Sequence, residues 1–190
     1  MLVATHMLIA QKTYECLPDC LKSRISLRCF IFGNVKPDLI YRLSSISHRL
    51  QDSLPFVLDE IESLQNQEVE SARLSINLGV INHFLADFFC SAHYSEDNYC
   101  GPLKHFKYEL ELHQTFKRLE SIDRLKPSTL INSISANNNL SNIIGSLETE
   151  FALQNSSKEN DIYFALRACN ITNSCLLNNV RFSVPANTIA

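Results

Sequence analysis

The chain has 190 residues, a formal net charge of −3 and a hydrophobic fraction of 45%. These values suit one globular domain, and without a block of basic residues they give no electrostatic footprint for nucleic acid. Only 4 glycines and 6 prolines interrupt the chain, so the composition favours helices over the many turns of a β-sandwich.

The first half of the chain carries the pattern of several helices and one turn. An apolar pattern behind Thr5 predicts a helix over residues 5–17. Residues 33–38, with the sequence GNVKPD, predict a turn followed by the start of a helix at Asp38. Three more helices are predicted: one that contains His48 and ends near residue 53, one from Pro55 to residue 64, and one over residues 70–92.

In the second half, Gly101 and Pro102 precede a helix predicted over residues 103–124. An Asn- and Ser-rich stretch at 132–142 predicts a loop or a weak helix. Two helices follow, over 140–154 and 158–178, and residues 181–190 are predicted to be an irregular tail. With no internal repeat and no linker, the sequence predicts a single all-α domain over residues 1–190.

Cysteine usage and the apolar runs bear on location. The seven cysteines form no paired framework, which is typical of free thiols in a reducing compartment. The first residues lack the pattern of an export signal, and no run reaches the ~18 apolar residues of a membrane span. We expect a cytoplasmic protein, or a secreted one if a leader has been removed from it.

Two histidines have a carboxylate four residues later: His83 with Asp87, and His105 with Glu109. In a helix these positions share one face, so each pair can aim at one point. Imidazole and carboxylate are ligands of Zn²⁺, and His93, six residues beyond Asp87, could turn toward the second pair. Helical bundles build metal sites from facing helices in this way.

The alternative is that each histidine is a hydrogen-bonded core or boundary residue and that each pair is only a weak surface interaction worth ~0.2–0.5 kcal/mol. Two observations favour metal binding. The segment INHFLADFF surrounds His83 and Asp87 with apolar residues, where an unpaired carboxylate would be costly to bury. Four of the six histidines also fall within residues 83–113.

Eight positions together resemble the bacterial zinc-dependent phospholipase C family, which is related to the S1/P1-type nucleases. They are His6, the Asp38 of GNVKPD, His48, the H-x3-D of His83 and Asp87, His93, and the H-x3-E of His105 and Glu109. Order and residue type agree at all eight, over about residues 5–112. One H-x3-D alone is a weak signal, whereas the ordered set is specific. The resemblance implies a helical bundle of the phospholipase C and P1 nuclease type.

The resemblance also implies the role of each position. It assigns His48, His83 and Asp87 to one zinc, His93, His105 and Glu109 to a second, and His6 with Asp87 to a third, Asp87 bridging. In the family an N-terminal tryptophan completes the third site. This sequence has no tryptophan, so Met1 would have to supply those atoms, and we expect two or three zinc ions. Asp38 matches the acid assigned as the general base, or as the carboxylate that orients the attacking water.

The implied activity is hydrolysis of a phospholipid or a related small phosphodiester by water that zinc activates. Zinc lowers the pKa of such water from about 15.7 toward about 7. The implied partners are that substrate and, transiently, a membrane surface, with no nucleic acid. Two alternatives stay open: an S1/P1-like nuclease or nucleotidase, and a non-catalytic metal-binding helical protein.

Several other side chains near these positions are not assigned to the site. We interpret His113 and Asp52 as lying outside it, and Cys90 and Cys100 as thiols that do not bind zinc. The helical spacing predicts that five aromatic residues lie in the core: Phe84, Phe88, Phe89, Phe106 and Tyr108. Tyr94 and Tyr99 are the better candidates for the rim of the site.

Overall fold

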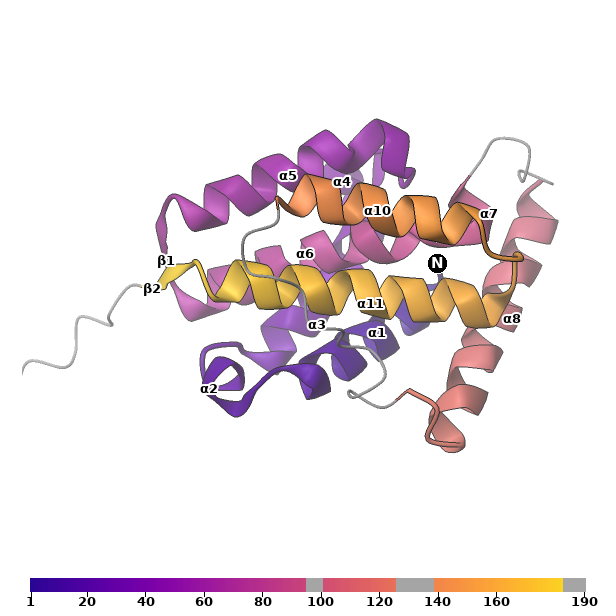
Figure 1. The fold of residues 1–190 in the computed structure, drawn as a ribbon, viewed down its shortest axis with the longest axis horizontal. Coiled ribbons are helices and arrows are strands. Elements are labelled where there is room, and N and C mark those ends of the chain that lie inside the picture. Colours follow the sequence, from indigo (N-terminus) through magenta and orange to yellow (C-terminus); the bar gives the residue numbers. More distant parts are fainter. Residues whose placement is uncertain (95–100, 126–138, 183–190) are drawn as a thin grey trace, which may run out of the picture.

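Helix α6, Ser71–Phe88, runs through the middle of the protein and is buried along most of its length. The computed structural model describes residues 1–94, 101–125 and 139–182. Within them α6 packs against α1 (Val3–Cys16), α3 (Leu27–Leu39), α5 (Leu50–Gln65) and α11 (Lys158–Leu177). Helix α10, Leu140–Ala152, covers α11, and α8, Pro102–Ser121, packs across one end (Figure 1). The arrangement confirms the predicted all-α domain.

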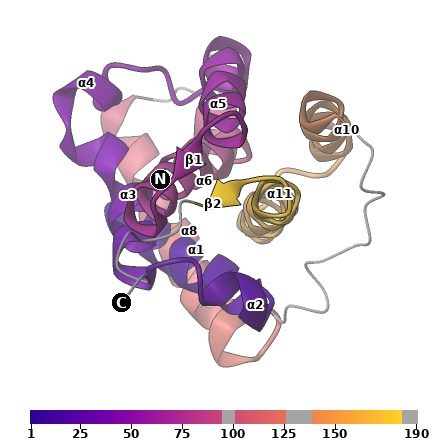
Figure 2. The same cartoon turned by 90° about the vertical axis from the view of Figure 1, so that its left-hand side faces the viewer.

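Three short helices and one small sheet complete the described chain. The short helices are α2 (Asp19–Lys22), α4 (Tyr41–Ser44) and α7 (Ser91–Tyr94). Strand β1, Glu68–Val69, pairs in parallel with β2, Arg181–Phe182, beyond the end of α11 (Figures 1 and 2). The prediction of an irregular tail is therefore wrong for Arg181 and Phe182, because they pair with the segment before α6. Residues 183–190 lie outside the described part.

Two glycines let α3 and α6 approach closely. A Cβ atom at Gly33 would overlap the carbonyl oxygen of Ile76, and one at Gly79 would overlap the carbonyl oxygen of Phe30. The turn predicted at 33–38 is therefore wrong: Gly33 lies inside α3, where it serves the helix crossing rather than a turn. Pro37 lies in the last turn of α3. Proline has no N–H, so one backbone hydrogen bond of the helix is lost, but the loss falls close to the end of the helix.

His48 lies in the loop before α5, not in a helix as predicted. Hydrogen bonds hold this loop: the Ser47 hydroxyl donates to Asp52 over 2.7 Å, and the Ser53 hydroxyl donates to the Ser47 carbonyl. Helix α5 starts at Leu50 and continues through Pro55, which was predicted to open it. From this loop the His48 ring reaches Asp87, with its Nδ1 2.7 Å from Oδ2 of Asp87.

The other predicted helices are confirmed with small changes at their ends. Helix α6 ends at Phe88 rather than at residue 92, and α8 starts at Pro102 after Gly101, whose φ of 87° suits glycine. Asn139 and Ser157 cap α10 and α11 through their side-chain oxygens. None of the described helices is both long and apolar enough to cross a bilayer. The six cysteines in the described ranges are free.

Candidate metal centre

All eight predicted site residues lie close together around the C-terminal end of α6. They come from α1 (His6), the last turn of α3 (Asp38), the loop before α5 (His48), α6 (His83 and Asp87), α7 (His93) and α8 (His105 and Glu109). These residues form three groups, and within each group the ligand atoms lie within 4.8 Å of one another. The groups are His6, His83 and Asp87; Asp38, His48 and His83; and His93, His105 and Glu109. Such groups of imidazole and carboxylate are suited to zinc.

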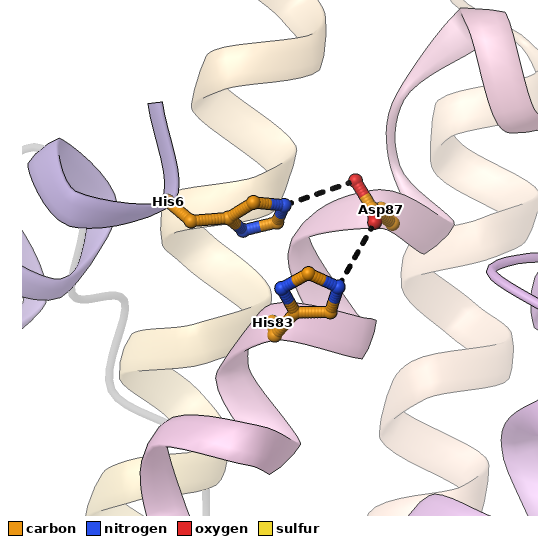
Figure 3. Close-up of side chains that lie close together, drawn as sticks. All are labelled: His6, His83 and Asp87. Carbon is orange, nitrogen blue, oxygen red and sulfur yellow. Dashed lines mark ion pairs between the residues drawn. The ribbon is translucent and has the colours of Figure 1, made fainter. Parts of the chain in front are cut away.

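The carboxylate of Asp87 lies at the centre of the cluster and faces two sides. Its Oδ2 is 2.7 Å from Nδ1 of His48 and 3.5 Å from Nε2 of His83. Its Oδ1 is 2.6 Å from the amino nitrogen of Met1 and 3.5 Å from Nε2 of His6. Figure 3 shows the rings of His6 and His83 next to each other, each facing one oxygen of this carboxylate. Asp87 therefore connects the groups, as a bridging ligand would.

The third group lies beside Asp87, between α7 and α8. Oε1 of Glu109 is 2.9 Å from Nε2 of His105 and 3.2 Å from Nε2 of His93. The amino nitrogen of Met1 lies 3.2 Å from the same oxygen and 3.1 Å from Nε2 of His93. The structure thus brings the Met1 amino group into the cluster, between the carboxylates of Asp87 and Glu109.

The orientation of the His83 ring is fixed by a backbone group on another helix. Nδ1 of His83 lies 2.8 Å from the carbonyl oxygen of Asn34 on α3. Since a carbonyl oxygen can only accept, Nδ1 carries the hydrogen and the lone pair of the neutral ring is on Nε2. Nε2 faces Asp38 and Asp87 at 3.7 and 3.5 Å. This is the pattern by which proteins orient a metal-binding histidine.

Several buried polar atoms in the cluster have no hydrogen-bond partner. They are both ring nitrogens of His6, Nε2 of His83 and Oδ2 of Asp38. Buried polar atoms in native proteins are nearly always paired, because desolvation without a partner is costly. A cation would satisfy ligand atoms gathered in this way around one carboxylate. The residues present therefore fit a metal ion.

Charge in the cluster shifts the pKa values of its members. Burial alone would raise the pKa of the Asp87 carboxyl, but the Met1 amino group and the neighbouring histidines hold it well below its usual value. Burial opposes ionisation of Glu109 too, yet its hydrogen bond to His93 and the nearby positive charges lower its pKa to about 2. Burial and the charge of His6 hold the pKa of His83 far below 6.5. Two carboxylates and a neutral imidazole are ligand-competent states at neutral pH.

The cluster is only partly closed to solvent. The side chains of His6, His83 and Asp87 are 0% exposed, whereas those of Asp38 and His105 are 21% and 24% exposed. Asp38 belongs to one of the three groups, so its position suits a ligand as well as a base. Burial is the main cause that raises the pKa of its carboxyl.

The aromatic predictions hold in part. Phe84, Phe88 and Phe89 are fully buried, but Phe106 is 56% exposed because it lies on the face of α8 turned away from the core, so its core prediction is wrong. Tyr108 is only half-buried. Tyr99 and Cys100 lie outside the described ranges.

The residues interpreted as lying outside the site have partners elsewhere. Nδ1 of His113 is 3.1 Å from the hydroxyl of Thr5, and Asp52 accepts from Ser47. Cys90 is fully buried, and burial raises the pKa of its thiol, which leaves it a poor metal ligand.

Asp161 is a neighbour of the site that sequence reasoning missed. It is a buried carboxylate that contacts the helices carrying His93 and Glu109. Its partners are 53 and 70 positions away, so no local pattern could have revealed it.

A family model described as zinc dependent phospholipase C matches residues 5–161. Comparison with curated proteins gives no match, and neither does comparison with solved structures. The matched range contains every member of the cluster except Met1, and it ends at Asp161.

Proposed function

The chain belongs to the zinc-dependent phospholipase C family, and we propose that its clustered histidines and carboxylates are the zinc ligands and the base of that activity. The protein is a zinc-dependent hydrolase of phosphodiester bonds, and its substrate class is the phospholipid. The observation that carries the residue assignment is the set of unpartnered ligand atoms gathered around Asp87.

We propose three sites for zinc around the Asp87 carboxylate. His93, His105 and Glu109 would hold one ion, and His48, His83 and Asp87 a second. His6, Asp87 and the Met1 amino group would hold the third. The two faces of the Asp87 carboxylate support this division, since Oδ1 is nearest to Met1 and Oδ2 to His48.

When bound, zinc would balance the charge of the phosphodiester and favour ionisation of water at neutral pH. The protein's own residues would organise the reaction. Asn34 holds the His83 ring so that Nε2 faces the cluster, and α3 places the partly exposed Asp38 in it. The fully buried residues of the cluster keep water away from the side of Asp87 that faces the protein interior. Electrostatic interactions are stronger where water is excluded.

Asp38 is proposed as the general base. Its side chain is partly exposed to solvent. One of its oxygens has no hydrogen-bond partner, and the other is 3.7 Å from Nε2 of His83. A carboxylate in this position can accept a proton from water or orient that water toward the substrate. Burial raises its pKa, which makes it a better proton acceptor than an exposed aspartate.

A membrane surface is the proposed place of contact with substrate. Large apolar side chains flank both exposed site residues: Leu39 and Tyr41 follow Asp38, and Leu103 and Phe106 surround His105. They are 56% to 88% exposed. Exposed apolar groups at the edge of a site are typical of proteins that dip into a lipid interface. Arg42, Lys104 and Lys107, also exposed, would meet the lipid phosphates.

The function is tested by hydrolysis of phosphatidylcholine in mixed micelles, with and without a zinc chelator. A chromogenic phosphocholine diester measures the same chemistry without a lipid surface, and single-stranded DNA and a nucleotide serve as controls. We expect chelator-sensitive cleavage of both choline substrates and two or three zinc ions per chain by elemental analysis. Cleavage of the nucleic acid alone would instead support the nuclease alternative.

A further inference from the structure

A fully buried carboxylate joins three helices beside the metal centre. Asp161, on α11, is 0% exposed. Its Oδ2 accepts a hydrogen bond from the backbone N–H of Ser91 over 2.8 Å, and its Oδ1 accepts one from the Ser91 hydroxyl over 2.7 Å. The hydroxyl of Tyr108 donates to Oδ2 over 2.6 Å. Three donors from two helices thus converge on one side chain.

The two donors lie next to proposed zinc ligands. Ser91 is the first residue of α7, two positions before His93, and the backbone N–H of His93 bonds to the Cys90 carbonyl over 2.8 Å. Tyr108 directly precedes Glu109 on α8. Asp161 therefore fixes the distance between the helix that carries His93 and the helix that carries Glu109.

The energetic balance at Asp161 argues against a role in packing alone. Burial raises the pKa of its carboxyl, and the hydrogen bonds from Tyr108 and Ser91 oppose that shift. An apolar side chain in the same place would avoid the desolvation of a charge, so a carboxylate there is weak support for stability. Three directional hydrogen bonds do, however, specify one arrangement of the helices.

The surroundings add a second constraint on α8. The ammonium of Lys158, three residues before Asp161, lies 4.7 Å from the centre of the Tyr108 ring and 3.0 Å from Oε2 of Glu111. The start of α11 therefore contacts α8 on both sides of Glu109, at Tyr108 and at Glu111. Tyr108 is held at its ring and at its hydroxyl.

We propose that Asp161 is a positioning residue for the zinc ion of His93, His105 and Glu109. It sets α7 against α8 so that these three ligands share one ion. The inference rests on the proposed function, because it requires the cluster to bind zinc. The other two proposed sites are built mainly on α1, α6 and the loop before α5, so loss of Asp161 acts on one ion of the set.

The experiment compares zinc affinity in Tyr108→Phe, Ser91→Ala, Asp161→Asn and Asp161→Ala by competition with a chromophoric chelator. Tyr14→Phe is the matched control, because it removes a tyrosine hydroxyl that bonds to the Lys22 carbonyl, away from the cluster. Circular dichroism and thermal unfolding of the zinc-free proteins check the fold. Tyr108→Phe and Ser91→Ala each delete only one hydroxyl and test the idea if the Asp161 variants do not fold.

We expect one zinc equivalent to bind about 10-fold more weakly in Tyr108→Phe, and 10 to 100-fold more weakly in the Asp161 variants. The remaining equivalents and the control keep wild-type affinity. Asp161→Asn should lose less than Asp161→Ala, because its amide oxygen still accepts the N–H of Ser91.

The outcomes separate the two hypotheses. Wild-type protein that binds no zinc overturns the proposed function and this inference with it. Wild-type protein that binds zinc, with folded variants that hold every ion at wild-type affinity, overturns the inference and leaves the function standing. Equal weakening of all ions in the variants also contradicts a role at one group.

Discussion

The imidazole rings of His6 and His83 lie stacked, with centroids 3.9 Å apart and planes 23° from parallel. One ring comes from α1 and the other from α6. Two stacked imidazolium ions would repel each other, and burial together with the charge of His6 lowers the pKa of His83. His83 is therefore neutral at physiological pH, which is the form that binds metal ions.

The first prediction concerns Asp87. Asp87→Asn removes the charge that faces Met1, His48 and His83, so the ions that share this carboxylate lose their common ligand. We expect loss of at least one zinc per chain and a fall in hydrolysis of more than about 100-fold. Elemental analysis and the chromogenic diester measure the two effects. A variant with full zinc content and full activity would rule out the bridging role.

The second prediction separates Asp38 from the ligands. If Asp38 handles the proton, Asp38→Asn keeps zinc and lowers turnover by about 10²–10⁴-fold. The same two measurements apply, with Asp87→Asn as the reference for zinc loss. Equal zinc loss in both variants would make Asp38 a ligand, as its distance to His83 also allows.

The third prediction concerns the crossing of α3 and α6. Gly79→Ala places a methyl group on the backbone of Phe30, so α3 must move, and we expect a loss of about 1–3 kcal/mol in the free energy of unfolding. Gly145→Ala is the control: nothing lies within 4 Å of its added Cβ, and alanine in that helix should stabilise by about 0.5–1 kcal/mol. Urea titration of the zinc-free proteins measures both. Similar shifts in the two variants would contradict the close crossing.

The fourth prediction is a pH dependence from Glu109. Its pKa in the folded protein is about 2, below the ordinary 4.5, so the unfolded chain takes up the proton first as pH falls. The stabilisation is therefore present above about pH 4.5 and disappears as pH falls toward 2. The free energy of unfolding is measured for zinc-free wild type and Glu109→Gln at pH 5.5 and pH 3, and its change with pH is compared between the two proteins. If the free energy of unfolding of Glu109→Gln changes with pH as steeply as that of wild type, Glu109 does not contribute to the pH dependence.

The fifth prediction addresses membrane contact. Replacing Tyr41 and Phe106 by serine removes two exposed aromatic rings beside the site, and we expect about 10-fold weaker binding to phosphatidylcholine vesicles for each ring. Vesicle flotation measures it, with zinc content as the check on the site. Leu153→Ser is the control, because Leu153 is 82% exposed and directly follows α10, a helix that Figure 2 shows on the opposite side of the molecule from α4. Unchanged flotation of the double variant would remove these rings from the interface.

The sequence was sufficient to identify the eight residues of the cluster. His83 with Asp87 and His105 with Glu109 follow the spacing of one helix face, so local geometry made each pair visible before any tertiary contact was known. The family resemblance then supplied His6 and Asp38, which have no local partner of this kind, and His48, whose neighbour four residues later, Asp52, lies outside the cluster. The structure brings all of them together.

Tertiary contacts account for what the sequence did not reveal. Gly33 and Pro37 look like a turn, but the approach of α6 makes a glycine necessary inside α3. Phe106 follows a helical pattern, yet none of the described helices packs over that face of α8, and the side chain stays exposed. The Asn34 carbonyl that orients His83 is a backbone atom, which no side-chain pattern can report.

The helices that carry the ligands are spread along the chain, and this limits when the site can be assembled. His6 lies on the first helix and Glu109 on α8, with α3, α5, α6 and α7 between them. The full set of ligands cannot come together until α8 has been synthesised, and bringing such remote segments together is entropically slow. The complete ligand set therefore exists only once α1, α6 and α8 have packed together, so the protein's affinity for zinc depends on contacts between helices that are far apart in the sequence.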